Sequence, residues 1–561
     1  MSLRKYQMLI GGDWQDAASG QFFETHDPYT GKAWALIPRC CEADVGRAVT
    51  AAKAAFDSGS WPALTATQRG ALLRKLGDLI AANAESLAET EVRDNGKLIS
   101  EMLGQTRYVP QWYYYYGGLA DKIEGGVLPI DKAGVFNFTR WEPLGVVAAI
   151  VPWNSPLLLL SWKLAPALAA GNTVVIKPSE FTSASTLEFG RLVAEAGFPP
   201  GVVNIVTGFG KDVGEPLVTH PDIAKIAFTG GEMSGQRVYE SAAKGLKRVT
   251  LELGGKSPNI VFDDAVMEDA VKGAISGIFA ATGQTCIAGS RLLVQRSVHD
   301  EFVDRLVAFA KTAKMGNPAD PETQVGPVTT PPQYKKILDY IAVGKLEGAQ
   351  VALGGGPADK VRFGDGWFIE PTIFTGVTNR MRIAQEEIFG PVLSVIPFAD
   401  EDEAIAIAND TVYGLAAGVW TQSIRRALLM SERLRAGTVW VNTYRAVSFM
   451  SPFGGYKRSG LGRESGKEAI YEYLQQKSVW ISTATDVPNP FVLRCPSAPM
   501  AGPRHQATEP KTAFIRSRDL GRHHSDRHQS RAGHTTIVGT ANPAHLQDNV
   551  AILPAASRPV R

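Results

Sequence analysis

Short apolar segments alternate with helical segments through the middle of this chain, and this alternation constrains the fold more than any other feature. The segment at 145–154, GVVAAIVPWN, is continuously apolar and stops at a turn, as expected of a strand buried on both faces. A helical segment follows at 157–170, and Gly171 is suited to cap its C-terminus. Further buried strands are expected in NTVVIKPSE, VVNIVTG and IAKIAFTGG. Repeated strand–helix–strand units predict an α/β fold, a mostly parallel sheet with helices on both faces.

A second alternating series starts near GGKSPNIVF and continues to about residue 442, which predicts a second α/β domain rather than an extension of the first sheet. The segment 136–145, FNFTRWEPLG, has the alternation of an exposed ribbon. Residues 495–561 are rich in His, Arg, Pro and Ser with little apolar periodicity, so we expect a disordered tail. A metal-binding role for RHHSDRH within this tail is the alternative.

The net charge of +2 argues against nucleic acid or an anionic membrane as the main partner. The adjacent cysteines Cys40 and Cys41 are poorly placed for a disulfide, and no CxxC or Cys/His cluster offers a metal site. A reducing, cytoplasmic location is therefore expected. We expect no signal peptide, because the N-terminus MSLRKYQMLIGGDW has no apolar core segment. We also expect no membrane span, because the most apolar stretch, LLLLSWKLAPALAAG, is short and interrupted by Lys163 and Pro166.

Glycine-rich turns are candidates for phosphate binding. GFGKDVG misses the dinucleotide fingerprint by one residue, and LGGKSP fails as a P-loop because Thr250 stands where an earlier glycine is required. TGGEMSGQ at 229–236 lies between a strand and a helix, where small residues and a helix N-terminus can receive a phosphate. The alternative is that this turn is glycine-rich for packing alone.

Lys177 and Glu180 follow a buried strand at the carboxyl edge of the expected sheet, where α/β folds bind ligands. A lysine can hold a ribose hydroxyl or a phosphate, and a carboxylate can accept hydrogen bonds from a ribose diol. A surface salt bridge between the two is the alternative interpretation.

Glu252 and Cys286 are the candidates for chemistry. Glu252 lies inside the apolar strand LEL, where lost hydration raises a carboxyl pKa toward that of a general base; pairing with Lys247 or Arg248 is the alternative. Cys286 lies among small residues in FAATGQTCIAGSR, which give a thiolate access and room for a substrate. A cysteine–histidine hydrolase would also need an imidazole, and the histidines outside the tail lie in no motif-like setting: His26, His220 and His299.

Taken together, the chain resembles the aldehyde dehydrogenase superfamily over about residues 5–490. The resemblance rests on VPWNSP, VVIKPSE, FTGGEMSG, LELGGKSPNIVF, GQTCIAGSR, EEIFGPV and SPFGGYKRSGLGRE, in the family's order. It implies a modified Rossmann cofactor domain, an α/β catalytic domain, and a β-ribbon oligomerisation arm with a C-terminal segment. The corresponding ranges are 1–124 with 143–253, 254–442, and 125–142 with 443–490.

The resemblance implies that Cys286 is the nucleophile, which forms a thiohemiacetal and then a thioester with an aldehyde. Asn154, with the backbone N–H of Cys286, would hold the oxyanion, and Glu252 would activate the water that hydrolyses the thioester. The activity implied is NAD-dependent oxidation of a small-molecule aldehyde to its acid, by the non-acylating branch of the family. The alternatives are a CoA-acylating semialdehyde dehydrogenase, which needs no hydrolytic base, and a non-catalytic binding protein on the same fold.

NAD is the cofactor implied, with NADP as the alternative, because the charge of Glu180 would repel a 2′-phosphate. The GxxxxG from Gly230 to Gly235 would replace the usual fingerprint, which explains the mismatch above. Gly231 departs from the family, since many members have a serine there that bonds the pyrophosphate. The resemblance assigns these residues to the cofactor: Trp153, Lys177, Glu180, Gly230, Gly231, Gly235, Leu253, Glu387 and Phe389.

The substrate tunnel implied by the resemblance would be aromatic and apolar. Arg445 falls near its expected mouth, where it would attract a carboxylate on a semialdehyde acid; an exposed salt bridge is the alternative. The exposed strand edges of the arm predict a homodimer or homotetramer. The residues assigned to the tunnel are Tyr108, Trp112, Trp162, Thr285, Ile287, Arg445, Val447 and Phe453.

Overall fold

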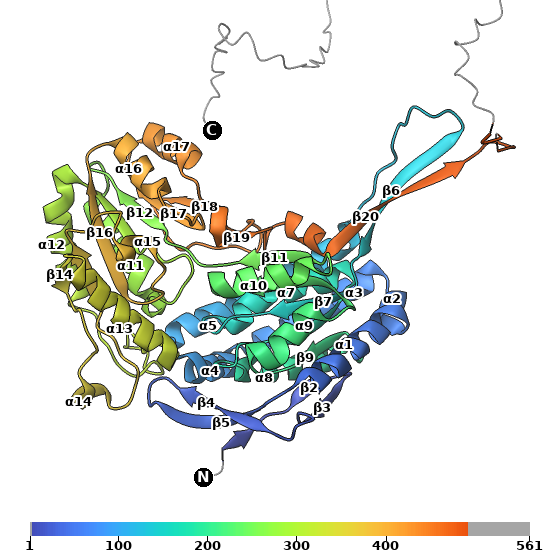
Figure 1. Cartoon of the computed structure of the whole chain (residues 1–561), viewed down its shortest axis with the longest axis horizontal. Coiled ribbons are helices and arrows are strands. Elements are labelled where there is room, and N and C mark those ends of the chain that lie inside the picture. The colour runs from blue at the N-terminus through green and yellow to red at the C-terminus, as the bar shows by residue number, and fades with distance from the viewer. Residues whose placement is uncertain (1–2, 488, 492–561) are drawn as a thin grey trace, which may run out of the picture. The chain divides into compact units, whose positions relative to one another are not determined.

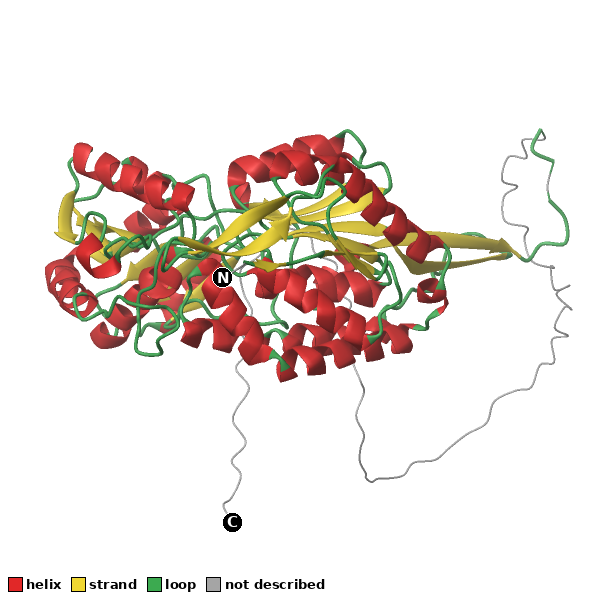
Figure 2. Cartoon of the chain, turned by 90° about the horizontal axis from the view of Figure 1, so that it is seen from below, coloured by secondary structure: helices red, strands yellow, loops and turns green. Residues whose placement is uncertain are grey.

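A computed structural model of the chain describes residues 3–487 and 489–491 (Figure 1). Two large sheets hold most of its strands, and helices lie on both faces of the strands (Figure 2). The tail expected to be disordered, 495–561, lies outside the described residues, as does its RHHSDRH stretch.

The first sheet is built on five parallel strands formed by the apolar segments of the sequence. The central strand shows why those segments are apolar throughout: Val146, Ala148 and Ile150 face one core, whereas Val147 and Ala149 face the other. The strand order is β19 (Gly460–Leu461), β11 (Arg248–Glu252), β10 (Ile223–Thr229), β7 (Val146–Ile150), β8 (Thr173–Lys177), β9 (Val203–Ile205), β2 (Met8–Ile10) and β3 (Asp13–Gln15), with β19, β2 and β3 antiparallel to their neighbours.

Helices cover both faces of this sheet. α1 (Glu42–Asp57) and α10 (Glu232–Ala243) contribute to one core, and α3 (Ala66–Ala82), α7 (Pro156–Ala170) and α8 (Ala184–Ala196) contribute to the other. α7 begins with Pro156 at its first position and ends at Gly171, whose φ of +97° is the left-handed cap that the sequence predicts.

The second sheet is parallel except at one edge, where β14 runs antiparallel to β15. α11 (Met267–Phe279) and α12 (His299–Ala310) pack on one face, and α16 (Glu401–Asn409) and α17 (Ile424–Arg433) pack on the other. The strand order is β14 (Gln350–Leu353), β15 (Thr372–Thr375), β16 (Val392–Phe398), β13 (Arg291–Gln295), β12 (Pro258–Val261), β17 (Ala416–Trp420) and β18 (Thr438–Val441).

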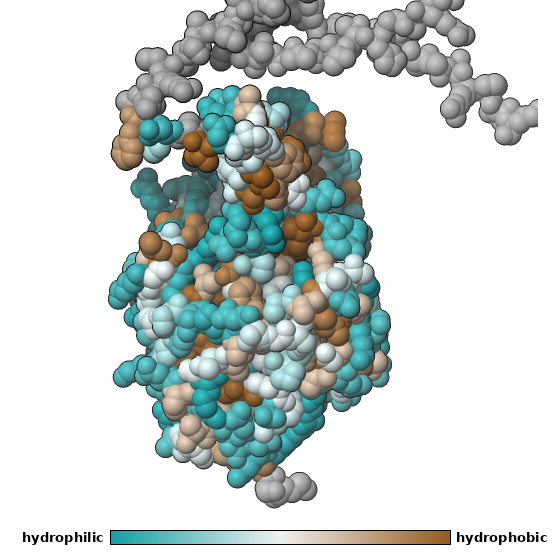
Figure 3. All heavy atoms as spheres, turned by 90° about the vertical axis from the view of Figure 1, so that its right-hand side faces the viewer, coloured by the Kyte–Doolittle hydropathy of each residue, from teal (hydrophilic) through white to brown (hydrophobic). Residues whose placement is uncertain are grey.

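A long antiparallel ribbon pairs β6 (Val135–Pro143) with β20 (Leu474–Ser482) and projects from the first sheet (Figure 1). Apolar side chains are exposed on it: Phe136, Trp480 and Ile481 are 46%, 57% and 47% exposed. Figure 3 views this end of the molecule, where brown hydrophobic atoms lie among the polar surface. The C-terminal segment also returns to the first sheet, because β19 pairs with β11.

The elements not yet named include a small three-stranded sheet and several helices. No helix among the described residues combines the length and apolarity needed to cross a bilayer. The elements are β1 (Arg4–Lys5), β4 (Phe22–Asp27), β5 (Lys32–Pro38), α2 (Ser60–Ala63), α4 (Ala84–Asn95), α5 (Ile99–Tyr108), α6 (Pro110–Leu119), α9 (Glu215–Thr219), α13 (Pro331–Leu346), α14 (Lys360–Phe363) and α15 (Arg382–Gln385).

Candidate active site

The carboxyl ends of the central strands place polar side chains at one edge of the first sheet. The register pairs Ile150 with both Lys177 and Phe228, and Thr229 with Glu252. The loops that follow β7, β8, β10 and β11 therefore leave the sheet at the same edge, which is where open α/β sheets bind ligands.

Cys286 lies in a turn between α11 and β13, so the second sheet carries it to this edge. Just before it, Ala281 and Thr282 both have a φ of +53°, a left-handed conformation that costs about 1–2 kcal/mol for a non-glycine residue. Burial, and then the charges of Glu252 and Glu387, raise the pKa of the Cys286 thiol to about 12. The thiol is therefore protonated at neutral pH, and its attack requires a base or a positive charge nearby.

Asn154 follows β7 and is 6% exposed. Its Nδ2 donates a hydrogen bond to the backbone oxygen of Gln284 at 3.1 Å, which ties the amide to the turn that carries Cys286. An amide nitrogen has two hydrogens to donate, so one remains for an oxyanion formed at the sulfur.

Glu252 ends β11 with both carboxylate oxygens buried and without a hydrogen-bond partner in the described chain. Burial, and then the charge of Glu464, raise its pKa well above the usual range of a carboxyl group. The alternative of a salt bridge from Glu252 to Lys247 or Arg248 is wrong. Lys247 donates to the backbone oxygens of His220 and Ile223, and Arg248 donates to the backbone oxygen of Leu474. An unpaired carboxylate of raised pKa is suited to general-base chemistry.

A buried ion pair lies next to Glu252, and no pattern in the sequence indicates it. Lys163 on α7 is fully buried, contacts the carboxylate of Glu464, and donates to Thr229 Oγ1 at 2.6 Å. The charges of Glu464 and Lys163 act on the pKa of Glu252 in opposite directions, raising and lowering it respectively. The pair therefore adjusts the proton affinity of the candidate base.

Two cavities meet at Cys286. One, of about 140 Å³, is lined by Trp153, Glu252 and Glu387; the other, of about 400 Å³, is lined by Tyr108 and Arg445. Both include Asn154, Leu159 and Cys286 in their walls. The sulfur can therefore be approached from two sides, by two different molecules.

A third cavity, of about 600 Å³, shares Trp153, Gly230 and Gly231 with the smaller of these two and extends along the sheet edge to Lys177 and Glu180. Lys177 Nζ lies 3.7 Å from a Glu180 carboxylate oxygen, so a cation and an acceptor occur side by side there. Lys211 and Arg237 add positive charge to its walls. A Cβ on Gly231 would meet nothing within 4 Å, so backbone can be approached closely at that turn. This donor set fits a dinucleotide that reaches from Lys177 to Cys286.

Two of the predicted residues lie behind the cavity walls. Gly235 packs against Leu253, whose Cδ2 would be 2.3 Å from an added Cβ, and neither cavity wall includes Gly235. Trp112 is fully buried, stacks on Trp162 and donates from Nε1 to Ser465. The other predicted cofactor and tunnel residues line one or more of the three cavities: Trp153, Lys177, Glu180, Gly230, Gly231, Leu253, Glu387 and Phe389 on one side of Cys286, and Tyr108, Trp162, Thr285, Ile287, Arg445, Val447 and Phe453 on the other.

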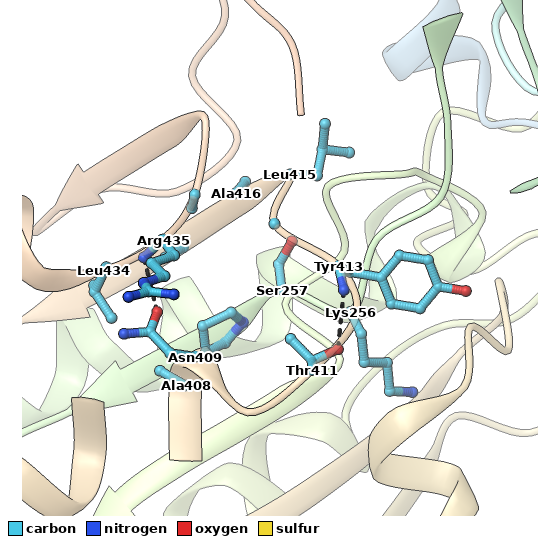
Figure 4. A pocket seen from close by; sticks show the side chains of 14 residues that line it. Lys256, Ser257, Ala408, Asn409, Thr411, Tyr413, Leu415, Ala416, Leu434 and Arg435 are labelled. Atoms are coloured by element: carbon cyan, nitrogen blue, oxygen red, sulfur yellow. Dashed lines mark hydrogen bonds between the residues drawn. The ribbon is translucent and has the colours of Figure 1, made fainter. Parts of the chain in front are cut away.

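A further pocket lies between Lys256, Asn409 and Arg435 (Figure 4). Its free volume is about 10 Å³, which suffices for about one water molecule. Residues of its walls are hydrogen-bonded to one another: Arg435 N donates to Asn409 Oδ1 at 2.7 Å, and Tyr413 N donates to Thr411 Oγ1 at 3.3 Å (Figure 4). This pocket has no room for a substrate.

A comparison with known protein families identifies the family of this chain. Residues 14–479 match the family described as "Aldehyde dehydrogenase family". The chain belongs to the aldehyde dehydrogenase family. It is 48% identical over 495 residues to (Z)-2-((N-methylformamido)methylene)-5-hydroxybutyrolactone dehydrogenase of Acinetobacter baylyi, covering 88% of this chain and all of that relative. It is 46% identical to human retinal dehydrogenase 2, covering 86% and 92% of the two chains.

Solved structures of other aldehyde dehydrogenases share the fold. A betaine aldehyde dehydrogenase from Staphylococcus aureus, crystallised with NAD+, has a TM-score of 0.85 and 40% identity, with 87% of this chain and 99% of that chain covered. An NAD+ complex of a Bacillus cereus aldehyde dehydrogenase has a TM-score of 0.84 and 46% identity, with 85% and 97% covered. The aldehyde dehydrogenase fold expected from the motifs is confirmed.

Proposed function

We propose that this protein oxidises an aldehyde to the carboxylic acid with NAD+ as the acceptor. The observation that carries the proposal is that Cys286, Asn154 and Glu252 line one cavity of about 140 Å³. This cavity shares walls with the cavity at Lys177 and Glu180 on one side and with the 400 Å³ cavity on the other. The names of the relatives support it, since they include dehydrogenases of retinal and of betaine aldehyde, and solved relatives contain NAD+.

In the first step, the thiol of Cys286 loses its proton and the sulfur attacks the aldehyde carbon. Water in the cavities beside the partly exposed thiol accepts this proton, so Glu252 remains free to act as the base in the second half of the reaction. The free N–H of the Asn154 amide and the backbone N–H of Cys286 stabilise the oxyanion of the thiohemiacetal.

A bound NAD+ would supply the hydride acceptor for oxidation at the aldehyde carbon. Lys177 and Glu180 would hold the adenosine ribose, and Glu387 and Phe389 would lie on the nicotinamide side of the cavity. The carboxylate of Glu180 accepts a 2′-hydroxyl but repels a 2′-phosphate, so NAD+ is preferred over NADP+.

The second half of the reaction is hydrolysis of the thioester on Cys286. Glu252 removes a proton from water, which attacks the thioester carbon, and the acid leaves as the thiol is restored. This role argues against the CoA-acylating alternative, in which a thiol replaces water and no base is required. The complete set of Cys286, Asn154 and Glu252 argues against a non-catalytic binding protein.

A panel of aldehydes assayed with NAD+ tests the proposal, with the absorbance of the reduced nicotinamide as the readout. We expect oxidation of at least one aldehyde by the wild type and a fall to background in Cys286→Ala, because Cys286 is the only cysteine of the described residues that lines these cavities. Cys41→Ser is the matched control, since Cys41 is a free, partly exposed cysteine outside the site. Retained oxidation in Cys286→Ala would contradict the proposal.

The proposed assembly is a homodimer or homotetramer formed through the β6–β20 ribbon. A two-stranded ribbon is at best marginally stable alone, and this one exposes Phe136, Trp480 and Ile481. A second copy of the chain can cover these side chains.

The free thiols of Cys40, Cys41 and Cys286 favour a reducing compartment, and a cytoplasmic location stays a prediction.

A further inference from the structure

The cavity on the substrate side of Cys286 has a charged wall that a purely apolar aldehyde does not need. Lys97, Glu101 and Arg445 line it together with the aromatic and aliphatic residues that the sequence predicts. Its volume of about 400 Å³ accommodates a molecule of several heavy atoms. The balance of charge in this wall indicates what that molecule carries.

Lys97 and Glu101 offset one another. Lys97 is 3% exposed and donates from Nζ to Ser155 Oγ at 2.8 Å, and Glu101 attracts its charge. Glu101 accepts a hydrogen bond from the backbone N–H of Ala281 at 2.7 Å. Each of these groups therefore has a partner within the protein, and together they contribute no net charge.

Arg445 is the positive charge that remains. Its one hydrogen bond within the described chain is a long one, from Nη1 to the backbone oxygen of Ser276 at 3.4 Å. No carboxylate of the described residues lies within 4.0 Å of its guanidinium, so the exposed salt bridge considered from the sequence is absent there. A guanidinium has five N–H donors, and nearly all of these are available to a ligand.

Arg445 also lies close to the buried cation of Lys97. Burial lowers the pKa of Lys97 to about 8, and the like charge of Arg445 acts in the same direction, so the two cations are close enough to repel. Arg445 has a φ of +67°, a left-handed backbone that asparagine or glycine would adopt with less strain. Neither the backbone nor a neighbouring acid accounts for an arginine at this position.

We propose that the substrate is an aldehyde with a carboxylate at its other end, and that Arg445 binds this carboxylate while the aldehyde carbon lies at Cys286. A planar guanidinium binds a carboxylate through two parallel hydrogen bonds, which fixes orientation as well as charge. The inference rests on the proposed function, because it assumes that the cavity receives the aldehyde.

The test compares kcat/KM for the probes 4-oxobutanoate, 5-oxopentanoate and 6-oxohexanoate with that for the neutral aldehydes pentanal and hexanal. We expect the wild type to prefer at least one anionic probe. In Arg445→Gln, the ratio of kcat/KM for that probe over the neutral aldehydes falls by about tenfold to a hundredfold, the range of a charged hydrogen-bonded contact. The change lies mainly in KM, and Arg445→Lys restores part of it.

Arg425→Gln is the matched control, because Arg425 lies on α17 with its side chain 81% exposed and outside every wall of the site. It should leave the ratio at the wild-type value. Oxidation of neutral aldehydes shows whether each variant is folded. Equal losses on anionic and neutral aldehydes in Arg445→Gln, or no preference in the wild type, would overturn the inference. Failure of the wild type to oxidise any aldehyde would instead refute the proposed function.

Discussion

At the scale of single residues, the chemistry depends on two groups whose pKa values the fold raises. Cys286 has a thiol pKa raised to about 12 and Glu252 has a carboxyl pKa well above its usual range, both chiefly through burial. Each group therefore keeps its proton to a higher pH than the free side chain does, and each becomes more reactive when the pH rises. We therefore expect activity to increase as the pH rises through the raised pKa of Glu252.

The buried pair of Lys163 and Glu464 predicts how that pH dependence can be moved. Glu464→Gln removes the negative charge that raises the pKa of Glu252 and leaves the positive charge of Lys163. The pKa of Glu252 therefore falls, and the rising limb of kcat against pH should shift to lower pH. A pH series of steady-state rates measures the shift.

Glu468→Gln is the control for this prediction, because Glu468 is an exposed carboxylate in the same C-terminal segment. It should leave the pH profile in place. An unchanged profile in Glu464→Gln, or a shift to higher pH, would contradict the role assigned to the buried pair.

Some site residues are predictable from sequence because local context marks them. Glu252 stands out as a charge in an apolar strand, and Cys286 as a thiol among small residues. Lys163 and Glu464 give no such signal, since they are 301 positions apart and meet only when α7 packs against the C-terminal segment. In the sequence, Lys163 is visible only as an interruption of an apolar stretch. Trp112 shows the opposite case. The sequence predicts it in the tunnel wall, but it lies behind that wall and stacks on Trp162.

At the scale of elements, the central strands and helices follow directly from the pattern of apolar residues. The strand at Val146–Ile150 alternates between two cores, which is why its sequence is continuously apolar. The cap at Gly171 was also predictable, because a left-handed residue is needed where α7 ends. The pairing of β19 with β11 was not, since a two-residue strand has no periodicity from which to recognise it.

The cap of α7 gives a prediction about stability. Gly171→Ala should destabilise the fold by about 1–2 kcal/mol, because a side chain must adopt a φ of +97°. The nearest atom to an added Cβ, Arg69 Cζ, is 3.5 Å away, so steric overlap contributes little. Denaturant unfolding measures the loss.

Gly118→Ala is the matched control, since this glycine lies within α6 and an added Cβ would meet nothing within 4 Å. It should leave stability unchanged or increase it by up to about 1 kcal/mol. Similar losses in both variants would show that the left-handed cap is not the cause.

At the scale of the whole molecule, the two sheets contribute different parts of one site. The first sheet supplies Asn154, Glu252 and the cavity at Lys177 and Glu180, and the second supplies Cys286 on the turn before β13. Movement of one sheet relative to the other would separate the sulfur from its base.

The ribbon gives a prediction about assembly. The double variant Phe136→Ser with Ile481→Ser removes two exposed apolar side chains and should shift the protein toward a smaller species in size-exclusion chromatography with light scattering. Val361→Ser is the control, because Val361 is 96% exposed on α14, outside the ribbon. An unchanged mass in the double variant would contradict the proposed role of the ribbon.

The central claim is that Cys286 carries an acyl group which Glu252 helps water to remove. Rapid mixing of Glu252→Gln with NAD+ and an aldehyde that the wild type oxidises tests it most directly. We expect a burst of reduced nicotinamide of about one equivalent per subunit, then a steady rate at least about a hundredfold below wild type, the usual size of a general-base contribution. Mass spectrometry should find the acyl group on the peptide that contains Cys286. A steady rate equal to that of the wild type, or an acyl group absent from Cys286, would contradict the account.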